Sequence, residues 1–196
     1  AVFLASGTMG NLASLLAHAE RGRAAIVGDE SHVLHYEAGG ASALGGIVFH
    51  SVPTRPDGTL PLAHIESAIR TSADIHAAPT GVICLENTTP VRGVVITPEY
   101  VASVAEVAAR AGLPIHLDGA RLWNAAVAGG LPITEWTRHV TTVNLCLSKG
   151  LAAPVGSVVA GPPRVIARVR RMRKMLGGGM RQVGVLGAAG LVALDQ

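Results

Sequence analysis

The stretch TVNLCLSKGLAAPVGSVVA (Thr142–Ala160) contains two apolar runs that only six residues separate. The runs Thr142–Leu147 and Pro154–Ala160 are aliphatic and almost free of charge, which predicts two strands. A connection between parallel strands needs roughly a dozen residues, so these two strands are predicted to be antiparallel neighbours. Lys149 lies in the short connection, beside a strand expected to be buried. An ammonium group there is costly unless another group neutralises or uses it.

The rest of the chain alternates short apolar runs with helical patterns. Further strands are predicted at Ala24–Gly28, Ile47–Val52, Gly81–Glu86 and Pro114–Asp118. Helices are predicted at Met9–Arg21, His32–Leu44, Pro61–Arg70, Pro98–Ala111 and Arg121–Ala128. Short strands separated by helices of about 10–15 residues indicate βαβ units. We therefore predict an α/β fold: a mainly parallel sheet with one antiparallel strand and helices on both faces.

Composition describes a globular chain with an aliphatic core. Of 196 residues, 49% are hydrophobic and 15% are charged. No apolar run approaches the roughly 20 residues that span a bilayer, and the N-terminal residues lack the basic region of a signal peptide. Both ends of the chain, Ala188–Gln196 included, have the pattern of a domain interior, so we expect a fragment.

The two cysteines, Cys84 and Cys146, lie in separate strand-like runs. They are too few for a disulfide framework or a zinc site, so no metal site is predicted. Buried, reduced thiols are the expectation. A reducing compartment, the cytoplasm, is therefore expected.

Charge is spread unevenly along the chain. The formal net charge is +3, yet Trp136–Leu194 holds nine Lys and Arg residues and no Asp or Glu. The centre of this region, RVIARVRRMRK (Arg164–Lys174), has apolar residues at helical spacing and is predicted to be an amphipathic helix. Such a helix can form a nucleic-acid surface, or a solvated face that contacts an anionic ligand or a partner subunit. The second interpretation is favoured, and we expect neither nucleic acid nor membrane as a partner.

Polar residues follow several of the predicted strands. They are Asp29, His32, Glu86, Asn87, Asp118, Arg121, Ser148 and Lys149. Ligands of open α/β sheets bind beyond the carboxyl ends of the strands, so these side chains are expected to face one crevice.

The segment SGTMGN (Ser6–Asn11) combines small residues with the start of a helical pattern. Backbone N–H groups at a helix N-terminus bind anions such as phosphate. A simple helix N-cap by Ser6 or Thr8 is the alternative, and the two are compatible.

The segment HLDGAR (His116–Arg121) places an acid at a strand end and an arginine three residues later. Asp118 there can hold a proton on a heteroaromatic nitrogen, and Arg121 can bind a carboxylate or phosphate. The alternative is an internal Asp–Arg pair that caps the next helix.

Lys149 has two interpretations as well. A lysine at a strand end can be a nucleophile for carbonyl groups, or it can extend from the edge of the sheet into water. The possible anion site at Ser6–Asn11, the acid and arginine at Asp118 and Arg121, and the segment GGGMR (Gly177–Arg181) favour the nucleophile. Together these parts predict a site for pyridoxal 5′-phosphate.

Six runs carry a resemblance to a known family. They are SGTMGN (Ser6–Asn11), GDESH (Gly28–His32), LENT (Leu85–Thr88), HLDGARLWNA (His116–Ala125), CLSKGLAAPVGS (Cys146–Ser157) and RKMLGGGMRQ (Arg173–Gln182). In this order they resemble the L-threonine aldolases, which are aspartate-aminotransferase-like (fold-type I) pyridoxal-phosphate enzymes in the branch shared with β-eliminating lyases. The similarity covers essentially the whole chain.

The resemblance implies a domain organisation and an activity. Residues 1–196 would form the cofactor-binding large domain, without an N-terminal segment and a small C-terminal domain. The protein would be a homo-oligomer, dimer or tetramer, with shared active sites. It would cleave L-threonine or L-allo-threonine to glycine and an aldehyde by a retro-aldol reaction. Another reaction of the branch (β-elimination or racemisation) and an inactive fragment remain alternatives.

The resemblance also implies roles for cofactor-binding residues. Lys149 would be the Schiff-base lysine, and Asp118 would hold the proton of the pyridine ring. Gly7 and Thr8 would bind the phosphate, and His32 would stack on the ring.

Other implied roles concern the substrate. Arg121 would bind the substrate carboxylate or the cofactor's 3′ oxygen, with help from Ser6. Tyr36 matches an aromatic position near the substrate side chain. Lys174 would approach the substrate and Arg181 the cofactor, from this subunit or a neighbour.

One segment departs from the family pattern. The family often reads Glu-Asn-Thr-His where this chain has ENTTP (Glu86–Pro90). The family also places a second histidine near the substrate's β-hydroxyl. His76 is the best candidate for it here, with an ordinary surface histidine as the alternative. Thr89 therefore leaves the preference between threo and erythro substrates open.

Overall fold

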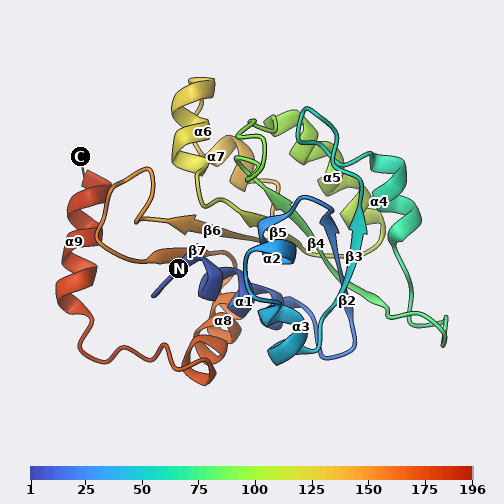
Figure 1. Cartoon of the computed structure of the whole chain (residues 1–196), viewed down its shortest axis with the longest axis horizontal. Helices are drawn as coiled ribbons and strands as arrows, with labels where there is room; N and C mark the ends of the chain where they lie inside the picture. The colour runs from blue at the N-terminus through green and yellow to red at the C-terminus, as the bar shows by residue number, and fades with distance from the viewer. Residues whose placement is uncertain (196) are drawn as a thin grey trace.

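Within residues 1–195, which the computed structural model describes, seven strands form one sheet in the order β1-β7-β6-β5-β4-β2-β3 (Figure 1). Their bounds are β1 Val2–Leu4, β2 Ala24–Gly28, β3 Val48–Val52, β4 Thr80–Glu86, β5 Ile115–Asp118, β6 Thr142–Cys146 and β7 Ser157–Ala160. β7 pairs antiparallel with both β6 and β1, and the other pairs are parallel. The predicted mainly parallel sheet with one antiparallel strand is confirmed.

Strand β1 was not among the predicted strands. Only three residues long, it pairs with β7 at the edge of the sheet, with Leu4 opposite Ser157. Such a short run has no recognisable period before the small residues that follow it. Its partner is more than 150 residues away in the sequence, so only tertiary pairing defines it.

The helices lie on both faces of the sheet (Figure 1). Their bounds are α1 Gly7–His18, α2 His32–His35, α3 Gly40–Gly45, α4 Leu62–Ala68, α5 Pro98–Arg110, α6 Leu122–Gly129, α7 Thr134–Thr137, α8 Pro163–Met175 and α9 Gly184–Asp195. α4 to α7 cover one face, and α1, α3 and α8 cover the other. In β2, Ile26 packs on the first face while Ala25 and Val27 pack on the second, because successive strand residues point to opposite sides.

The predicted single helix His32–Leu44 is wrong. Ala38 and Gly39 adopt left-handed backbone angles, with φ of 52° and 65°, and they separate α2 from α3. A helix cannot continue through this conformation, which glycine adopts without steric cost. The break turns the chain at Glu37, whose side chain becomes buried.

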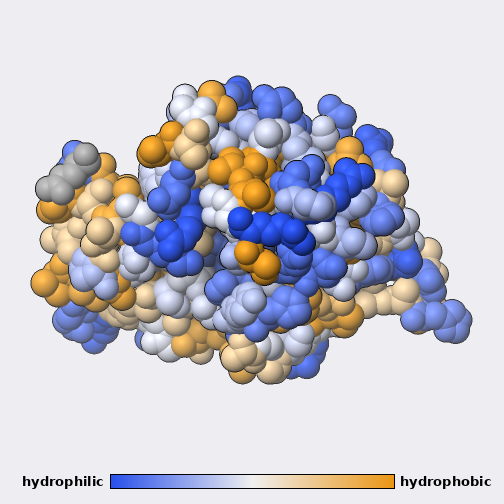
Figure 2. All heavy atoms as spheres, turned by 45° about the horizontal axis from the view of Figure 1, so that its top comes forward, coloured by the Kyte–Doolittle hydropathy of each residue, from blue (hydrophilic) through white to orange (hydrophobic). Residues whose placement is uncertain are grey.

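The basic segment forms the predicted amphipathic helix. In α8, Val165, Ile166 and Val169 are buried. Arg164, Arg168 and Arg170 of the same helix are exposed. The apolar pattern at Ala188–Gln196 is helical as far as Asp195, and Gln196 lies outside the described residues. α9 leaves Val185 and Leu191 exposed, and the hydrophobic colouring at the left of Figure 2 marks this helix.

Two further sequence expectations can be compared with the structure. Cys84 and Cys146 are buried and not paired with each other, as predicted. None of the helices within residues 1–195 combines the length and the apolar character needed to cross a membrane.

Close packing of α1 on the sheet yields a stability prediction. A Cβ atom at Gly10 would overlap the Asn144 side chain on β6. Gly10→Ala is therefore expected to lower the free energy of unfolding by about 1–3 kcal/mol, the usual cost of overpacking. Gly187→Ala in α9 is the control, because its Cβ would meet no atom within 4 Å. Urea unfolding of both variants checks this, and a Gly10→Ala protein as stable as the wild type would contradict it.

Candidate active site

A cleft lies beyond the carboxyl ends of β4, β5 and β6. It consists of two adjoining cavities of about 270 and 320 Å³. Both cavities are lined by His32, Asp118, Ala120 and Lys149. Residues from three segments far apart in the sequence thus meet in one place, as expected for the strand ends of an open α/β sheet. We call this joined space the cleft.

Asp118 is the buried carboxylate of the cleft. It is the last residue of β5, and only 8% of its surface is exposed. Its Oδ1 accepts a hydrogen bond from the Ala120 N–H at 3.0 Å, and its Oδ2 accepts one from Asn11 Nδ2 at 2.7 Å. Among residues 1–195 no cation forms an ion pair with this carboxylate. The negative charge of Asp118 is therefore available to a ligand.

Arg121 does not pair with Asp118, so the alternative of an internal acid–arginine cap is not realised. It is the N-cap residue of α6 and makes no side-chain capping hydrogen bond. It lines the cleft on the side of Glu86 and Thr89. A guanidinium in this position can bind a carboxylate in a bidentate manner.

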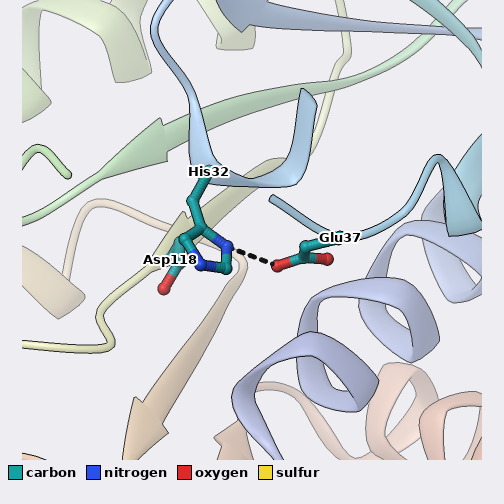
Figure 3. A group of neighbouring side chains, drawn as sticks. All are labelled: His32, Glu37 and Asp118. Atoms are coloured by element: carbon teal, nitrogen blue, oxygen red, sulfur yellow. Dashed lines mark hydrogen bonds and ion pairs between the residues drawn. The ribbon is translucent and has the colours of Figure 1, made fainter. Parts of the chain in front are cut away.

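His32 and Glu37 form an acid–base pair beside Asp118 (Figure 3). His32 begins α2, and its Nδ1 lies 3.0 Å from Glu37 Oε1. This hydrogen bond raises the pKa of His32 against the opposing effect of burial. Sequence reasoning missed Glu37, because residues five apart do not share a face of the continuous helix that was predicted.

Glu86 ends β4 and lines the cleft. Its Oε1 accepts a hydrogen bond from the His32 backbone N–H at 2.6 Å. Burial penalises its charged form, and nearby Asp118 adds to the effect, so the pKa of Glu86 is raised to about 9. Glu86 therefore carries a proton at neutral pH and adds no charge to the cleft. The sequence placed it at a strand end but gave it no role.

The protonated state of Glu86 predicts a pH effect on stability. The folded protein keeps this proton up to about pH 9, whereas the unfolded chain releases it near 4.5, so stability falls as pH rises between these values. From about pH 7 to pH 9, wild type is expected to lose up to about 1.4 kcal/mol per pH unit relative to Glu86→Gln. Urea unfolding of both cofactor-free proteins at several pH values measures the difference. Parallel curves would contradict a protonated Glu86.

The N-terminus of α1 closes one side of the cleft. Ser6 is its N-cap, and Ser6 Oγ accepts a hydrogen bond from the Met9 N–H at 3.1 Å. The predicted capping role of Ser6 is confirmed, while Thr8 lies inside the helix. Gly7 and Thr8 line the cleft in the first turn, where unpaired N–H groups and the helix dipole favour an anion. A Cβ atom at Gly7 would lie 2.8 Å from Cys146 Sγ, so the close approach of α1 to β6 requires glycine.

Lys149 lies in the turn between β6 and β7. It is exposed and lines both cavities of the cleft. β6 is an interior strand between β5 and β7, so the lysine does not extend from an edge of the sheet. Its backbone oxygen accepts a hydrogen bond from the Ala152 N–H at 3.0 Å, which closes the turn. The primary amine is thus presented to the space beside Asp118.

Four predicted residues do not line the cleft. Tyr36 is 60% exposed, with its ring centre 5.6 Å from that of His32. His76 is exposed in the turn that precedes β4, at the opposite end of this strand from Glu86. Lys174, in the last turn of α8, and Arg181, in the turn after it, are exposed. None of these four side chains lines the cleft of this chain, and their roles remain predictions.

Fold and cleft together define a class of protein: an α/β domain of the aspartate-aminotransferase-like type, as the resemblance implied. The sequence model of the family described as beta-eliminating lyase matches residues 1–196, and the chain belongs to this family.

Three known proteins illustrate the relationship. The chain is 49% identical, over its whole length, to "Probable low-specificity L-threonine aldolase 2" of Arabidopsis thaliana, and it covers 56% of that protein. It is 46% identical to "Low specificity L-threonine aldolase" of Escherichia coli K12, over 99% of this chain and 57% of that one. The solved threonine aldolase of Leishmania major superposes with a TM-score of 0.84 at 26% identity, over 97% of this chain and 55% of that one. The chain thus spans about half the length of these relatives.

Proposed function

We propose that the protein binds pyridoxal 5′-phosphate and cleaves L-threonine, L-allo-threonine and related β-hydroxy amino acids to glycine and an aldehyde. The observation that carries this proposal is the meeting of Lys149, Asp118 and the N-terminus of α1 in one cleft. Relatives that are 46–49% identical to this chain over the aligned residues are named as low-specificity L-threonine aldolases, which supports the choice of substrate.

The residues of the cleft fit this cofactor. The N-terminus of α1 offers unpaired N–H groups for a phosphate, and Asp118 offers a carboxylate for a ring N–H. Lys149 offers a primary amine for an aldehyde. Thr89 lines the cleft with a buried hydroxyl that has no hydrogen-bond partner among the described residues. Such an unsatisfied group is costly unless a ligand reaches it.

The chemistry divides between cofactor and chain. Pyridoxal phosphate, when bound, supplies an electron sink for breaking the Cα–Cβ bond of an amino acid. Lys149 would hold the cofactor aldehyde and yield its place to the incoming amine of the substrate. Asp118 would keep a proton on the ring nitrogen, because a carboxylate stabilises the cationic form of a neighbouring group. Gly7 and Thr8 would hold the phosphate.

The substrate would be oriented by polar residues on both sides of Lys149. Arg121 would bind its carboxylate, with Ser6 nearby, and His32 would lie against the ring. Orientation matters because these residues would favour cleavage of the Cα–Cβ bond over other bonds only by holding the substrate in one fixed position. Thr89 stands where the family often has histidine, so the preference between L-threonine and L-allo-threonine is left to experiment.

A homo-oligomer with shared active sites completes the proposal. Lys174 and Arg181 are exposed and do not line the cleft of their own chain, which suits a role in the cleft of a neighbouring subunit. The two unpaired thiols suit a reducing compartment such as the cytoplasm.

Product identification tests the activity. Incubation with L-threonine and pyridoxal phosphate is expected to release glycine and acetaldehyde in equal amounts, and omission of the protein gives the background. Formation of pyruvate or D-alanine from other amino acids, without glycine from L-threonine, would replace the aldolase with β-elimination or racemisation. No turnover together with no bound cofactor would overturn the proposed function.

A further inference from the structure

A hydrogen-bonded row of buried polar side chains runs from the wall of the cleft into the protein, and the proposed chemistry does not use it. We call this row the relay. Asn11, His116, Thr142 and Asn144 are each at most 2% exposed. They lie between α1 and the strands β5 and β6, and they connect to Asp118 on the cleft side and to His18 on the other. Buried polar groups are retained only when they are hydrogen-bonded, so the pattern of donors and acceptors carries information.

The Asn11 amide makes four hydrogen bonds. Its Nδ2 donates to Asp118 Oδ2 and to Glu37 Oε1, both at 2.7 Å. Its Oδ1 accepts from Asn144 Nδ2 at 2.8 Å and lies 3.1 Å from His116 Nε2. The reverse orientation would place the amide oxygen against two carboxylate oxygens. The two acids therefore fix which end of the amide faces them.

The orientation of Asn11 in turn fixes the proton positions of two histidines. His116 Nε2 must donate to Asn11 Oδ1, and burial lowers the pKa of His116 to about 3, so the ring is neutral and its Nδ1 accepts. Thr142 Oγ1 lies 2.9 Å from that Nδ1 and must donate to it. His18 Nε2, 2.8 Å from the same hydroxyl, must then be the donor. Burial lowers the pKa of His18 to about 4, which keeps this ring neutral too.

All donors of this relay therefore point in one direction, from His18 through Thr142, His116 and Asn11 to the two carboxylates. We propose that Asn11, oriented by His116, is a positioning residue that holds the Asp118 carboxyl group in its orientation toward the cleft and limits how strongly Glu37 acts on His32. The proposal rests on the proposed function, because it assigns the relay to the residue that would hold the cofactor ring. Asn11 reaches the wall of the cleft, is 2% exposed, and would act on the cofactor through its hydrogen bond to Asp118.

The wild-type protein allows a first test that needs neither cofactor nor turnover. Long-range ¹H–¹⁵N NMR spectra of ¹⁵N-histidine-labelled, cofactor-free protein report the tautomer and charge of each ring. His116 is expected to remain neutral with its proton on Nε2 from about pH 5 to pH 9, since its pKa lies well below this range. A proton on Nδ1, or a His116 ring that becomes charged in this range, would overturn the proposal.

Asn11→Leu tests the effect on the cleft. Glu37 Oε1 loses the donor that competes with His32, so the NMR titration midpoint of His32 is expected to rise. Affinity for pyridoxal 5′-phosphate, measured by equilibrium titration of its absorbance, is expected to fall roughly tenfold to a hundredfold, as for the loss of a hydrogen bond to a charged group. Ser14→Ala is the matched control, because Ser14 is buried on the same helix but donates only to the Gly10 backbone oxygen.

The outcomes of these experiments distinguish failure of the positioning role of Asn11 from failure of the proposed function. Unchanged cofactor affinity and an unchanged His32 midpoint in a folded Asn11→Leu protein would overturn the positioning role. Absence of cofactor binding by the wild type would overturn the proposed function, while the His116 tautomer would still report on the relay. If Asn11→Leu does not fold, the wild-type NMR experiment decides alone.

Discussion

Replacing Lys149 with alanine is expected to abolish cofactor attachment and to reduce cleavage of L-threonine by at least roughly 10²–10⁴-fold, the contribution of a single proton-transferring group. Loss of the amine removes both the nucleophile for the cofactor aldehyde and a proton carrier beside Asp118. The absorbance spectrum of the protein with added pyridoxal phosphate measures the attachment, and the rate of glycine formation measures turnover. Lys149 is exposed in a turn, so folding should be unaffected.

Lys149→Arg separates nucleophilicity from charge. Arginine keeps a positive charge in the cleft but does not lose its proton, so it cannot take the place of the amine. It is therefore expected to be as inactive as the alanine variant while retaining more of the affinity for the phosphate group. Arg110→Ala, which removes an exposed cation of α5, controls for surface charge. A Lys149→Ala protein that still forms the cofactor adduct would remove Lys149 from the proposed site.

Asp118→Asn is expected to lower the rate of threonine cleavage roughly 10²–10³-fold, as does the loss of one preorganised electrostatic partner in other enzymes. A neutral amide stabilises a ring N–H less than a carboxylate does, so the ring would lose its proton more readily. Steady-state rates of glycine formation measure the loss. Saturation with cofactor keeps the comparison free of differences in binding.

The free energy of unfolding of Asp118→Asn distinguishes loss of the electrostatic role of Asp118 from a general loss of structure. Asp118 is buried with no ion-pair partner among the described residues, and it lies close to Glu37 and Glu86. Replacing it with a neutral isostere is therefore expected to leave the free energy of unfolding unchanged or to raise it, a trade of stability for function that is common at active sites. Asp57→Asn, at an exposed turn, is the control. A loss of activity that merely follows a loss of stability would contradict the assigned role.

Sequence patterns predicted most of the elements near the cleft. α1, α4, α5 and α6 lie where predicted, with ends displaced by at most three residues. The connection around Lys149 is too short for a crossover, so its antiparallel pairing could be predicted from chain length alone. Strand β1 and the break at Ala38–Gly39 could not be predicted this way. The first depends on pairing with a distant strand, and the second on a local backbone choice that a helical pattern conceals.

By itself, the sequence determined the alternation of strands and helices and therefore the edge of the sheet at which Asp118 and Lys149 had to meet. Period, length and strand-end position are local properties, and parallel strands bring their carboxyl ends to one edge whatever lies between them. Only the tertiary structure decided which buried groups stand behind these residues. Asn11 lies 26 residues from Glu37 and 107 from Asp118 in the sequence, and His116 lies 26 residues from Thr142. These residues affect the cleft through their burial and the direction of their hydrogen bonds. Both exist only once α1 is packed on β5 and β6.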